Sequence, residues 1–245
     1  MSLKHLFSLF YKDISEKEGA FVCDEQLSVR ITKVLRLQNN EQLILFNESI
    51  HLLVSITIQK KGRYELVTAH VISASLNEVL TPTITLCPAL LKKPAFEEVV
   101  YVATQMGITR IEPLLTTQVQ REWGGEKERN RLQQISIAAA EQSRQFVLPI
   151  LLDPEALETK KFVSAEIIKL YFEVGKLPTK NLVQHLIEQK PKSILVVFGP
   201  EGGLTDHEQQ RLEEQGFIGY RLTPSVLRST EAITVGLGIL RSLMF

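Results

Sequence analysis

Cysteine is scarce in this chain. Its 245 residues include two cysteines, Cys23 and Cys87, which lie far apart, form no C-x-x-C pair and have no histidine at metal-ligand spacing. This pattern excludes a disulfide framework, indicates no metal site and predicts a reduced, cytoplasmic environment. The chain also has no apolar run long enough for a signal-peptide core or a membrane span. We therefore expect a protein that is neither secreted nor embedded in a membrane.

A surplus of charge of either sign is missing as well. The 28 basic and 28 acidic side chains give a net charge of zero, so the global field does not indicate nucleic-acid binding. Any such surface must be local. Apolar residues make up 44% of the chain, which is enough to fill the core of one large or two modest domains.

The first part of the chain has the pattern of a small antiparallel sheet. Alternating apolar residues predict strands at 41–46, 51–58 and 64–72. One helix is predicted at 25–37, with Asp24 as its N-cap. The pattern changes across residues 73–82, which read as a linker, so we divide the chain into domains at 1–75 and 76–245.

Strands and helices alternate after the linker. Strands are predicted at 83–87, 110–115, 169–174, 193–198 and 220–222, and helices at 94–105, 126–143, 181–189, 205–215 and 232–244. This alternation predicts an α/β domain with a parallel sheet and helices on both faces. Ligands in such sheets bind beyond the carboxyl ends of the strands.

The loop after the strand at 193–198 has the sequence Gly199-Pro200-Glu201-Gly202-Gly203 and precedes a capping box at 205–208. It lies at the sheet edge where a ligand is expected, and glycine lets a ligand approach the backbone closely. Leu204 replaces the lysine of a P-loop, and the glycine spacing does not fit the dinucleotide fingerprint. Because Glu201 would repel a phosphate, a neutral or cationic ligand fits better. The alternative is a purely structural turn stiffened by Pro200.

Three charged or small-residue patches could also carry function. Arg30, Lys33 and Arg36 recur at helical spacing, which is typical either of a solvated helix face or of contacts to RNA phosphates. Arg228 and Glu231 lie three residues apart at a helix start. The alternative to a functional role for them is a simple surface ion pair. In the same helix, Gly236 and Gly238 each cost about 1 kcal/mol against alanine, which predicts a close backbone approach on that side. Three alanines precede the polar residues 141–143 at the end of another helix.

Five segments, taken together and in order, resemble one family. Residues 195–205 (LVVFGPEGGLT) and 222–232 (LTPSVLRSTEA) are similar to the two cofactor motifs of the 16S ribosomal RNA (uracil-N3) methyltransferases, within the SPOUT superfamily. Residues 31–37 (ITKVLRL), 107–116 (GITRIEPLLT) and 139–143 (AAEQS) resemble three further motifs of that family. The resemblance covers nearly the full chain.

This resemblance implies a SPOUT-type parallel sheet with a trefoil knot and a small N-terminal PUA-like β-barrel domain that binds RNA. It implies S-adenosylmethionine as the methyl donor, a homodimer, and 16S ribosomal RNA in the small ribosomal subunit as the substrate. Mapping the family motifs onto this chain gives the expected cofactor-binding residues, namely Leu115, Thr116, Phe198, Gly199, Pro200, Glu201, Gly202, Gly203, Leu222, Thr223, Pro224, Leu227, Arg228 and Ser229.

Four residues expected beside the cofactor loop give a hypothesis for the catalytic groups. Arg228 would stabilise charge on the uracil oxygens, Glu231 or a water that it orients would accept the N3 proton, and Glu141 and Ser143 would position the base. Arg30, Lys33 and Arg36 would contact RNA phosphates. The chain departs from the family in that Glu231 lies one position later than the usual carboxylate and residues 117–119 replace the usual Glu-Arg-Ser. Two alternatives are a SPOUT ribose 2′-O-methyltransferase and a non-catalytic RNA-binding assembly protein.

Overall fold

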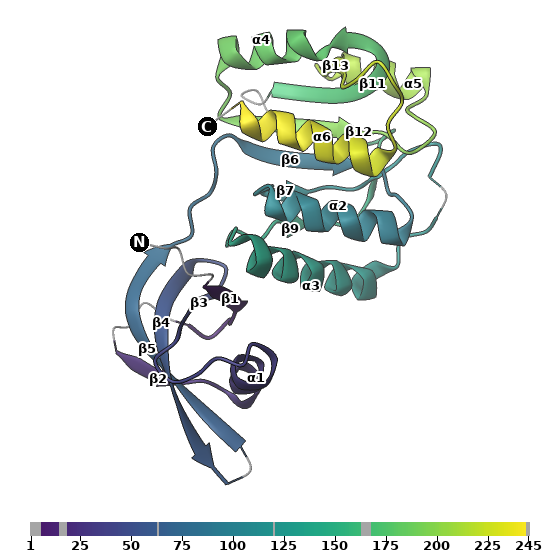
Figure 1. The fold of residues 1–245 in the computed structure, drawn as a ribbon. Helices are drawn as coiled ribbons and strands as arrows, with labels where there is room; N and C mark the ends of the chain where they lie inside the picture. Colours follow the sequence, from purple (N-terminus) through teal and green to yellow (C-terminus); the bar gives the residue numbers. More distant parts are fainter. Residues whose placement is uncertain (1–5, 15–18, 63, 120, 163–167, 244–245) are drawn as a thin grey trace. The chain divides into compact units, whose positions relative to one another are not determined.

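The computed structural model describes residues 6–14, 19–62, 64–119, 121–162 and 168–243 (Figure 1). The chain forms two compact units. The first consists of Met1–Glu78 and Ala140–Val147, and the second of Val79–Ala139 and Leu148–Phe245. None of the helices in these described ranges has the length and apolar character needed to cross a membrane.

The first unit contains a five-stranded sheet in the order β1-β3-β4-β5-β2. Its strands are β1 Phe7–Phe10, β2 Ala20–Val22, β3 Gln42–Phe46, β4 Ile50–Lys61 and β5 Tyr64–Leu76. Alternate residues of β3 and β4, such as Leu43 and Leu52, are fully buried in the core of this unit. The prediction of a purely antiparallel sheet is wrong at one edge, because β1 pairs with β3 in parallel. The other three pairings are antiparallel.

The helix of the first unit differs from the prediction after its first turns. Asp24 is the N-cap as predicted, since its Oδ1 accepts a hydrogen bond from the Leu27 amide at 2.7 Å. The α-helix α1 spans only Glu25–Val29 and continues as the π-helix η1, Arg30–Val34. The predicted α-helix to residue 37 is therefore wrong, and Arg36 has a left-handed φ of 55°. The β-branched residues at positions 29, 31, 32 and 34 disfavour a regular α-helix here.

The second unit contains a six-stranded sheet in the order β13-β11-β12-β6-β7-β9. Its strands are β6 Thr83–Pro88, β7 Arg110–Ile111, β9 Ile150–Leu151, β11 Ile168–Pro178, β12 Ser193–Phe198 and β13 Ile218–Arg221. Every pairing in this sheet is parallel, which confirms the predicted parallel sheet. The strand predicted at 110–115 is instead interrupted at Pro113, which has no amide proton, and β8, Leu114–Leu115, pairs with β10, Glu155–Ala156.

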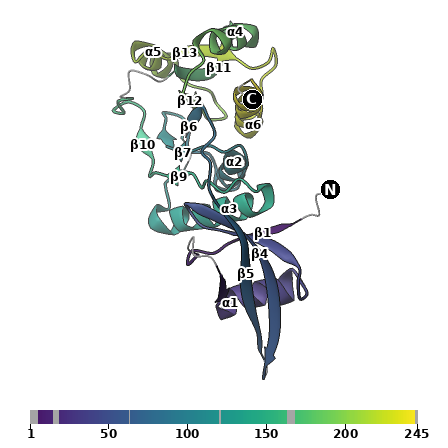
Figure 2. The same cartoon turned by 90° about the vertical axis from the view of Figure 1, so that its left-hand side faces the viewer.

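In the described ranges four helices connect these strands and a fifth, α6, follows β13. They are α2 Lys93–Gln105, α3 Gly125–Ser143, α4 Thr179–Gln189, α5 Asp206–Glu214 and α6 Ser229–Ser242. Alternate residues of β12 lie in two different apolar clusters, which shows that both faces of the sheet are covered. Val196 packs with residues of α2, α4 and α6, whereas Val197 packs with Leu212 of α5. Helices α2 and α6 lie side by side on one face in both views (Figures 1 and 2). The predicted helices on both faces are confirmed.

Two contacts fix α6 in this unit. A Cβ atom at Gly236 would lie 2.6 Å from the ring of Phe198, so only glycine lets the helix approach β12 this closely. This confirms the predicted close approach at Gly236, whereas Gly238 has no heavy atom within 4 Å of its Cβ position. At the other end, the buried Arg241 donates to the carbonyls of Met106 and Gly107 beyond the end of α2 at 2.7 and 2.5 Å. Burial lowers the pKa of Arg241 to about 10.

Candidate functional site

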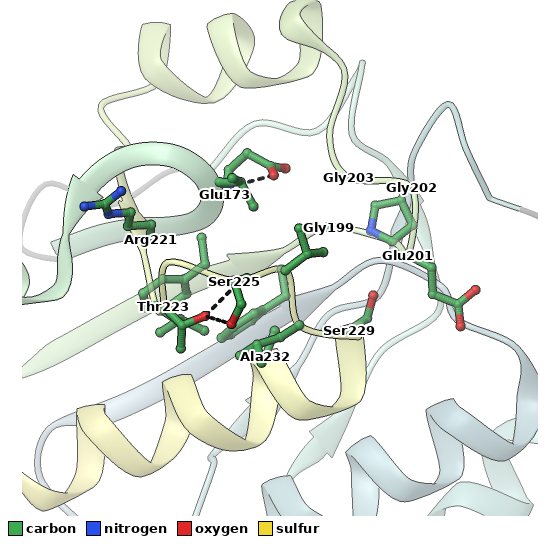
Figure 3. Close-up of a pocket in the computed structure, with 17 residues that line it drawn as sticks. Glu173, Gly199, Glu201, Gly202, Gly203, Arg221, Thr223, Ser225, Ser229 and Ala232 are labelled. Atoms are coloured by element: carbon green, nitrogen blue, oxygen red, sulfur yellow. Dashed lines mark hydrogen bonds between the residues drawn. The ribbon is translucent and has the colours of Figure 1, made fainter.

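A cavity of about 280 Å³ lies where β11, β12 and β13 end and α6 begins (Figure 3). It is lined by Phe172, Glu173, Val174, Phe198, Gly199, Pro200, Glu201, Gly202, Gly203, Arg221, Leu222, Thr223, Ser225, Val226, Leu227, Ser229 and Ala232. The site is thus at the carboxyl edge of the parallel sheet, as the strand order predicts. Three of these described residues carry charge, namely Glu173, Glu201 and Arg221.

The glycine loop after β12 forms a tight turn at one side of the cavity. The Gly203 amide donates to the Pro200 carbonyl at 2.9 Å, and Gly203 has a φ of 77°, which favours glycine. A Cβ atom at Gly199 would lie 3.1 Å from the Leu204 side chain, and one at Gly202 would overlap the Gln118 carboxamide. The loop therefore exposes backbone to the cavity at positions where side chains would have to displace their neighbours.

The start of α5 holds this loop in place through a buried carboxylate. Thr205 and Glu208 form the predicted capping box, in which Glu208 accepts from the Thr205 amide at 2.8 Å. The other oxygen of Glu208 accepts from the amide and hydroxyl of Thr117 at 2.7 and 3.1 Å. Burial alone would raise the pKa of Glu208, but these hydrogen bonds hold it below its ordinary value. The carboxylate thus ties the segment after β8 to the turn that follows the glycine loop.

The segment from β13 to α6 forms another wall of the cavity. The Thr179 hydroxyl lies 2.7 Å from the carbonyl of Arg221 and 2.9 Å from that of Leu222, which anchors the end of β13. The Thr223 hydroxyl donates to the Ser225 carbonyl at 2.6 Å. At the start of α6, Ser229 is buried. These hydrogen bonds fix the backbone of the loop without a charged side chain.

Most of the residues predicted to bind the cofactor line this cavity. They are Phe198, Gly199, Pro200, Glu201, Gly202, Gly203, Leu222, Thr223, Leu227 and Ser229. Four others are not among the described lining residues, namely Leu115, Thr116, Pro224 and Arg228. Their role in binding a cofactor stays a prediction, as does that of the residues that do line the cavity.

Thr116 follows β8 and is itself unusual. The residue is 8% exposed, and its Oγ1 has no hydrogen-bond partner in the described part of the chain. Buried hydroxyls are normally paired, so a ligand or a water molecule is needed to satisfy this one. Leu115, next to it, is 37% exposed at the end of the same strand.

The sequence did not predict seven of the lining residues, namely Phe172, Glu173, Val174, Arg221, Ser225, Val226 and Ala232. Phe172, Glu173 and Val174 could have been predicted, because they lie at the end of the strand predicted at 169–174. Its carboxyl end belongs to the same sheet edge as the glycine loop, so Glu173 could have been expected there. Arg221 ends the neighbouring strand β13 and could have been found in the same way.

The two residues predicted to act on the substrate proton and charge lie at the start of α6. Arg228 is exposed and occupies the N-cap position, and its carbonyl accepts from the Ala232 amide at 2.8 Å. Glu231 is also exposed, and its carboxylate accepts from the Thr230 hydroxyl at 2.8 Å. That hydrogen bond, a backbone amide and the charge of Arg228 lower the pKa of Glu231. Both side chains are therefore accessible, and the Glu231 carboxylate is ionised at neutral pH.

Glu141 and Ser143, which were predicted to position the base, belong to the first compact unit. The Glu141 carboxylate accepts from Arg30 at 2.7 Å and from the Phe10 amide at 2.8 Å. The Ser8 hydroxyl donates to the Glu141 carbonyl. Glu141 thus fixes strand β1 and the π-helix within its own unit, and its part in catalysis stays a prediction.

The three cations predicted to contact RNA differ in their surroundings. Arg30 is bound to Glu141, and Lys33 is bound to Glu65 at 2.7 Å. The hydrogen bond from Lys33 lowers the pKa of Glu65. Arg36 is exposed, and none of the ion pairs in the described ranges involves it. Arg30 and Lys33 lie in the π-helix η1 and Arg36 lies beyond its end with a left-handed φ, so the three do not share one α-helical face.

Metal binding has no support in the described ranges. No group of three or more histidine, cysteine or acidic side chains in them could hold a metal ion. Both cysteines are buried, and burial raises the pKa of Cys23 to about 12. Neither thiol is therefore a candidate ligand or nucleophile.

Comparison with known protein families identifies one match. Residues 78–241 match the RNA methyltransferase domain family. The matched range contains the glycine loop, the segment from β13 to α6 and all of the residues that line the cavity.

Curated relatives extend the match to the N-terminal part of the chain. The chain is 26% identical to the ribosomal RNA small subunit methyltransferase E of Mesomycoplasma hyopneumoniae, covering 89% of this chain and 93% of the relative. It is 27% identical to the protein of the same name from Mycobacterium tuberculosis, covering 94% of this chain and 89% of the relative.

Solved structures share the fold. A ribosomal RNA small subunit methyltransferase E from Neisseria gonorrhoeae, bound to S-adenosyl methionine, has a TM-score of 0.82 at 22% identity, with 98% of each chain covered. A methyltransferase from Legionella pneumophila, in complex with SAM, has a TM-score of 0.81 at 24% identity, also with 98% of each chain covered. At these identities the likeness concerns the fold.

Proposed function

This chain belongs to the RNA methyltransferase family, and we propose that it transfers a methyl group from S-adenosylmethionine to N3 of a uridine in 16S ribosomal RNA. The observation that carries the proposal is the glycine loop with its cavity at the carboxyl edge of β12. Relatives at 26% and 27% identity over most of the chain are named ribosomal RNA small subunit methyltransferase E, which supports the choice of RNA.

The chemistry of the cavity fits this methyl donor. S-adenosylmethionine has a positively charged sulfonium, an uncharged adenosine and a zwitterionic amino-acid end. The described cavity wall offers exposed loop backbone and two carboxylates, and its one cation is Arg221. A phosphate-bearing cofactor would suit this wall less well. Two neighbours in the fold comparison were solved with this donor bound, which supports the same assignment.

In the proposed mechanism the glycine loop and those residues of the segment 222–229 that line the cavity hold the adenosine and the methionine end. When bound, S-adenosylmethionine supplies an electrophilic methyl group whose C–S bond breaks, with its electron pair left on sulfur, as the N3–C bond forms. The protein must align donor and acceptor and make the acceptor nucleophilic. Uracil N3 carries a proton at neutral pH, so this proton has to leave.

Arg228 and Glu231 are the proposed groups for that step. The guanidinium of Arg228 would stabilise the negative charge that develops on the uracil oxygens as N3 loses its proton. Because the pKa of Glu231 is below its ordinary value, this carboxylate is a weak base. Glu231, or a water molecule that it orients and that passes the proton on to this carboxylate, would accept the N3 proton, which then exchanges with solvent. Glu141 and Ser143 complete the proposal as groups that position the base.

RNA binding is proposed for the first unit. Arg36 and Lys33 are the accessible cations, and Arg30 contributes less because Glu141 neutralises it. A second cavity of about 250 Å³ in this unit supports the assignment and is lined by Thr32, Lys33, Leu37, Gln38, Asn39, Ile58, Lys60 and Glu65. Phosphates would compete with Glu65 for Lys33, since exposed ion pairs are weak.

The proposal also includes the finer architecture expected from the family resemblance. Within the chain, we propose a trefoil knot in the second unit and a PUA-like barrel in the first. The protein is further proposed to form a homodimer and to be located in the cytoplasm. Large apolar side chains exposed on the second unit support a dimer, among them Val174, Leu177 and Val226. Light scattering of the purified protein should give twice the chain mass of 27.7 kDa.

One experiment tests the reaction itself. The purified protein is incubated with small ribosomal subunits and, separately, with naked 16S RNA, each with S-adenosylmethionine carrying a labelled methyl group. We expect labelled N3-methyluridine in the nucleoside digest and a stop in primer extension, because an N3 methyl blocks base pairing. A 2′-O-methylated nucleoside would assign the ribose reaction instead. Donor binding without any labelled nucleoside from either substrate would contradict the proposal.

A further inference from the structure

The wall of the cavity opposite α6 is an irregularity in strand β11. Phe172 and Leu177 both pair with Tyr220 of β13, so the four residues between them form a bulge. Gly175 in this bulge has a φ of 88°. Bulges of this kind redirect side chains and are frequent next to functional sites.

Both ends of the bulge are fixed to α5 through one side chain. Glu213 accepts a hydrogen bond from the Tyr171 hydroxyl at 2.5 Å and binds the ammonium of Lys176 at 2.9 Å. Hydrogen bonds to the Tyr171 hydroxyl and then to the Glu213 carboxylate raise the pKa of Lys176 to about 12. The bulge is therefore a braced part of the second unit, and the side chain that it directs to the cavity has a defined position.

That side chain is Glu173. Its Oε2 accepts from the Leu204 amide at 3.0 Å, and its Oε1 accepts from the Val174 amide at 2.8 Å. A Cβ atom at Gly203 would lie 3.2 Å from Oε2, so the carboxylate packs against the glycine loop itself. The residue is half-buried and lines the cavity.

Glu201, the other carboxylate of the cavity wall, is placed differently. It is exposed, and its side chain extends away from Thr223 and Ser225, whereas Glu173 lies between Arg221 and Gly203 (Figure 3). An exposed charge is screened by water and salt much more than a half-buried one. Glu173 is thus the carboxylate whose field acts on a bound ligand.

Resting on the proposed function, we infer that Glu173 is a specificity-determining residue that makes the cavity prefer the methyl donor, with its sulfonium charge, over the product, which lacks that charge. S-adenosylmethionine and S-adenosylhomocysteine share the adenosine and the amino-acid end, and they differ in the methyl group and in the sulfonium charge. A nearby carboxylate therefore stabilises the donor and not the product. The same side chain positions the glycine loop through the Leu204 amide, so product release and loop geometry depend on one residue.

The test compares binding of both compounds by isothermal titration calorimetry in the wild type and in Glu173→Gln. Glutamine keeps an oxygen that can accept from the Leu204 amide but removes the charge. We expect the Kd of S-adenosylmethionine to rise about five- to tenfold and that of S-adenosylhomocysteine to change less than about twofold. Glu188→Gln, an exposed site on α4 outside the cavity, is the matched control and should change neither value.

Each outcome decides the inference. An unchanged ratio of the two Kd values in Glu173→Gln would overturn it, and equal losses for both compounds would place the carboxylate on their shared ammonium and also overturn it. Failure of the proposed function is distinguishable, because the wild type would then bind neither compound. If Glu173→Gln does not fold, the wild type serves instead. Its preference for the donor should fall between about 0.05 M and about 0.5 M salt, and a constant preference would overturn the inference.

Discussion

The two compact units place their charged residues differently. In the second unit, Glu173, Glu201 and Arg221 line a cavity whose walls are otherwise backbone and uncharged side chains. In the first unit, Arg30 and Lys33 are bound to Glu141 and Glu65. Arg30 and Lys33 thus have carboxylate partners within their own unit, whereas the three charged residues of the second unit line a cavity that can take a ligand.

This difference teaches what a charged residue in a sequence pattern can predict. Arg30 and its partner Glu141 are 111 positions apart, so no local pattern shows that the two neutralise each other. A glycine loop is different, because its glycines and the capping box after it are consecutive in the sequence and can be recognised there. The glycine pattern in the sequence therefore located the cavity. The spacing of the basic residues did not show which of them have a carboxylate partner in the folded protein.

The largest expected effect concerns the second unit and its exposed cation at the start of α6, Arg228. We expect Arg228→Ala to lower the single-turnover rate about 10²- to 10³-fold, since it removes a group that stabilises developing charge. The affinity for S-adenosylmethionine should change little, because Arg228 is not among the described residues that line the cavity. Rapid-quench kinetics with labelled donor measures the rate, and Lys180→Ala on α4 is the control. A full rate in Arg228→Ala would remove the proposed role.

The next effect separates two glycines of the same helix. Gly236→Ala should lower the free energy of unfolding by about 1–3 kcal/mol, because the new methyl group would overlap the Phe198 ring. Gly238→Ala should raise it by about 0.5–1 kcal/mol, since its Cβ position is open and alanine favours a helix. Urea unfolding of the two variants measures both values. Equal changes of the same sign would show that α6 does not depend on the close approach to β12.

A smaller effect tests the buried carboxylate of Glu208. Glu208→Gln should lower the free energy of unfolding at pH 7 by about 1–2 kcal/mol, because an amide cannot accept all the hydrogen bonds from Thr117 and Thr205. The folded-state pKa of Glu208 is below its ordinary value of 4.5, so its stabilisation is complete above that value and is lost as the pH falls through the folded pKa. The difference between wild type and variant should therefore shrink in acid.

Urea titrations at several pH values measure this, with Glu214→Gln, an exposed site at the end of the same helix α5, as the control. The control should stay within about 0.5 kcal/mol of the wild type at every pH. A wild-type advantage that persists unchanged in acid would show that ionised Glu208 is not the source of the stabilisation.

The smallest effect sharpens the comparison within the first unit. Arg36→Ala should reduce the magnitude of the salt slope of RNA affinity by about 0.7, the value for one lost contact to a single strand. Arg30→Ala should change that slope less, because Glu141 already neutralises Arg30. Fluorescence anisotropy with a 16S fragment over a series of salt concentrations measures both. Equal reductions would mean that the ion pair opens when RNA binds.

The sequence predicted the parts of the fold that local chemistry determines. The capping box at Thr205 and Glu208, the N-cap at Asp24 and the parallel sheet of the second unit are all confirmed. The α-helix expected from residue 25 to residue 37 was wrong, because apolar spacing does not distinguish a regular helix from one that becomes π-helical at Arg30. The interruption at Pro113 follows from a property of proline that could have been applied.

The features that the sequence did not predict depend on contacts between residues that are far apart in the sequence. The bulge that directs Glu173 to the cavity arises from the register between β11 and β13, which no local pattern reports. The same holds for residues 140–147, which belong to the first unit although β6, α2, β7 and β8 of the second unit lie between them and the linker in the sequence. The orphaned hydroxyl of Thr116 is also visible only once its neighbours are known.

Hydrogen–deuterium exchange of the wild type, with and without S-adenosylmethionine, tests the central claim most directly. The account predicts slower amide exchange on donor addition in residues 199–204 and 222–229 and in the β11 bulge, with no comparable change in the sheet of the first unit. Protection confined to another region, or none at saturating donor, would contradict a binding site at the carboxyl edge of β12.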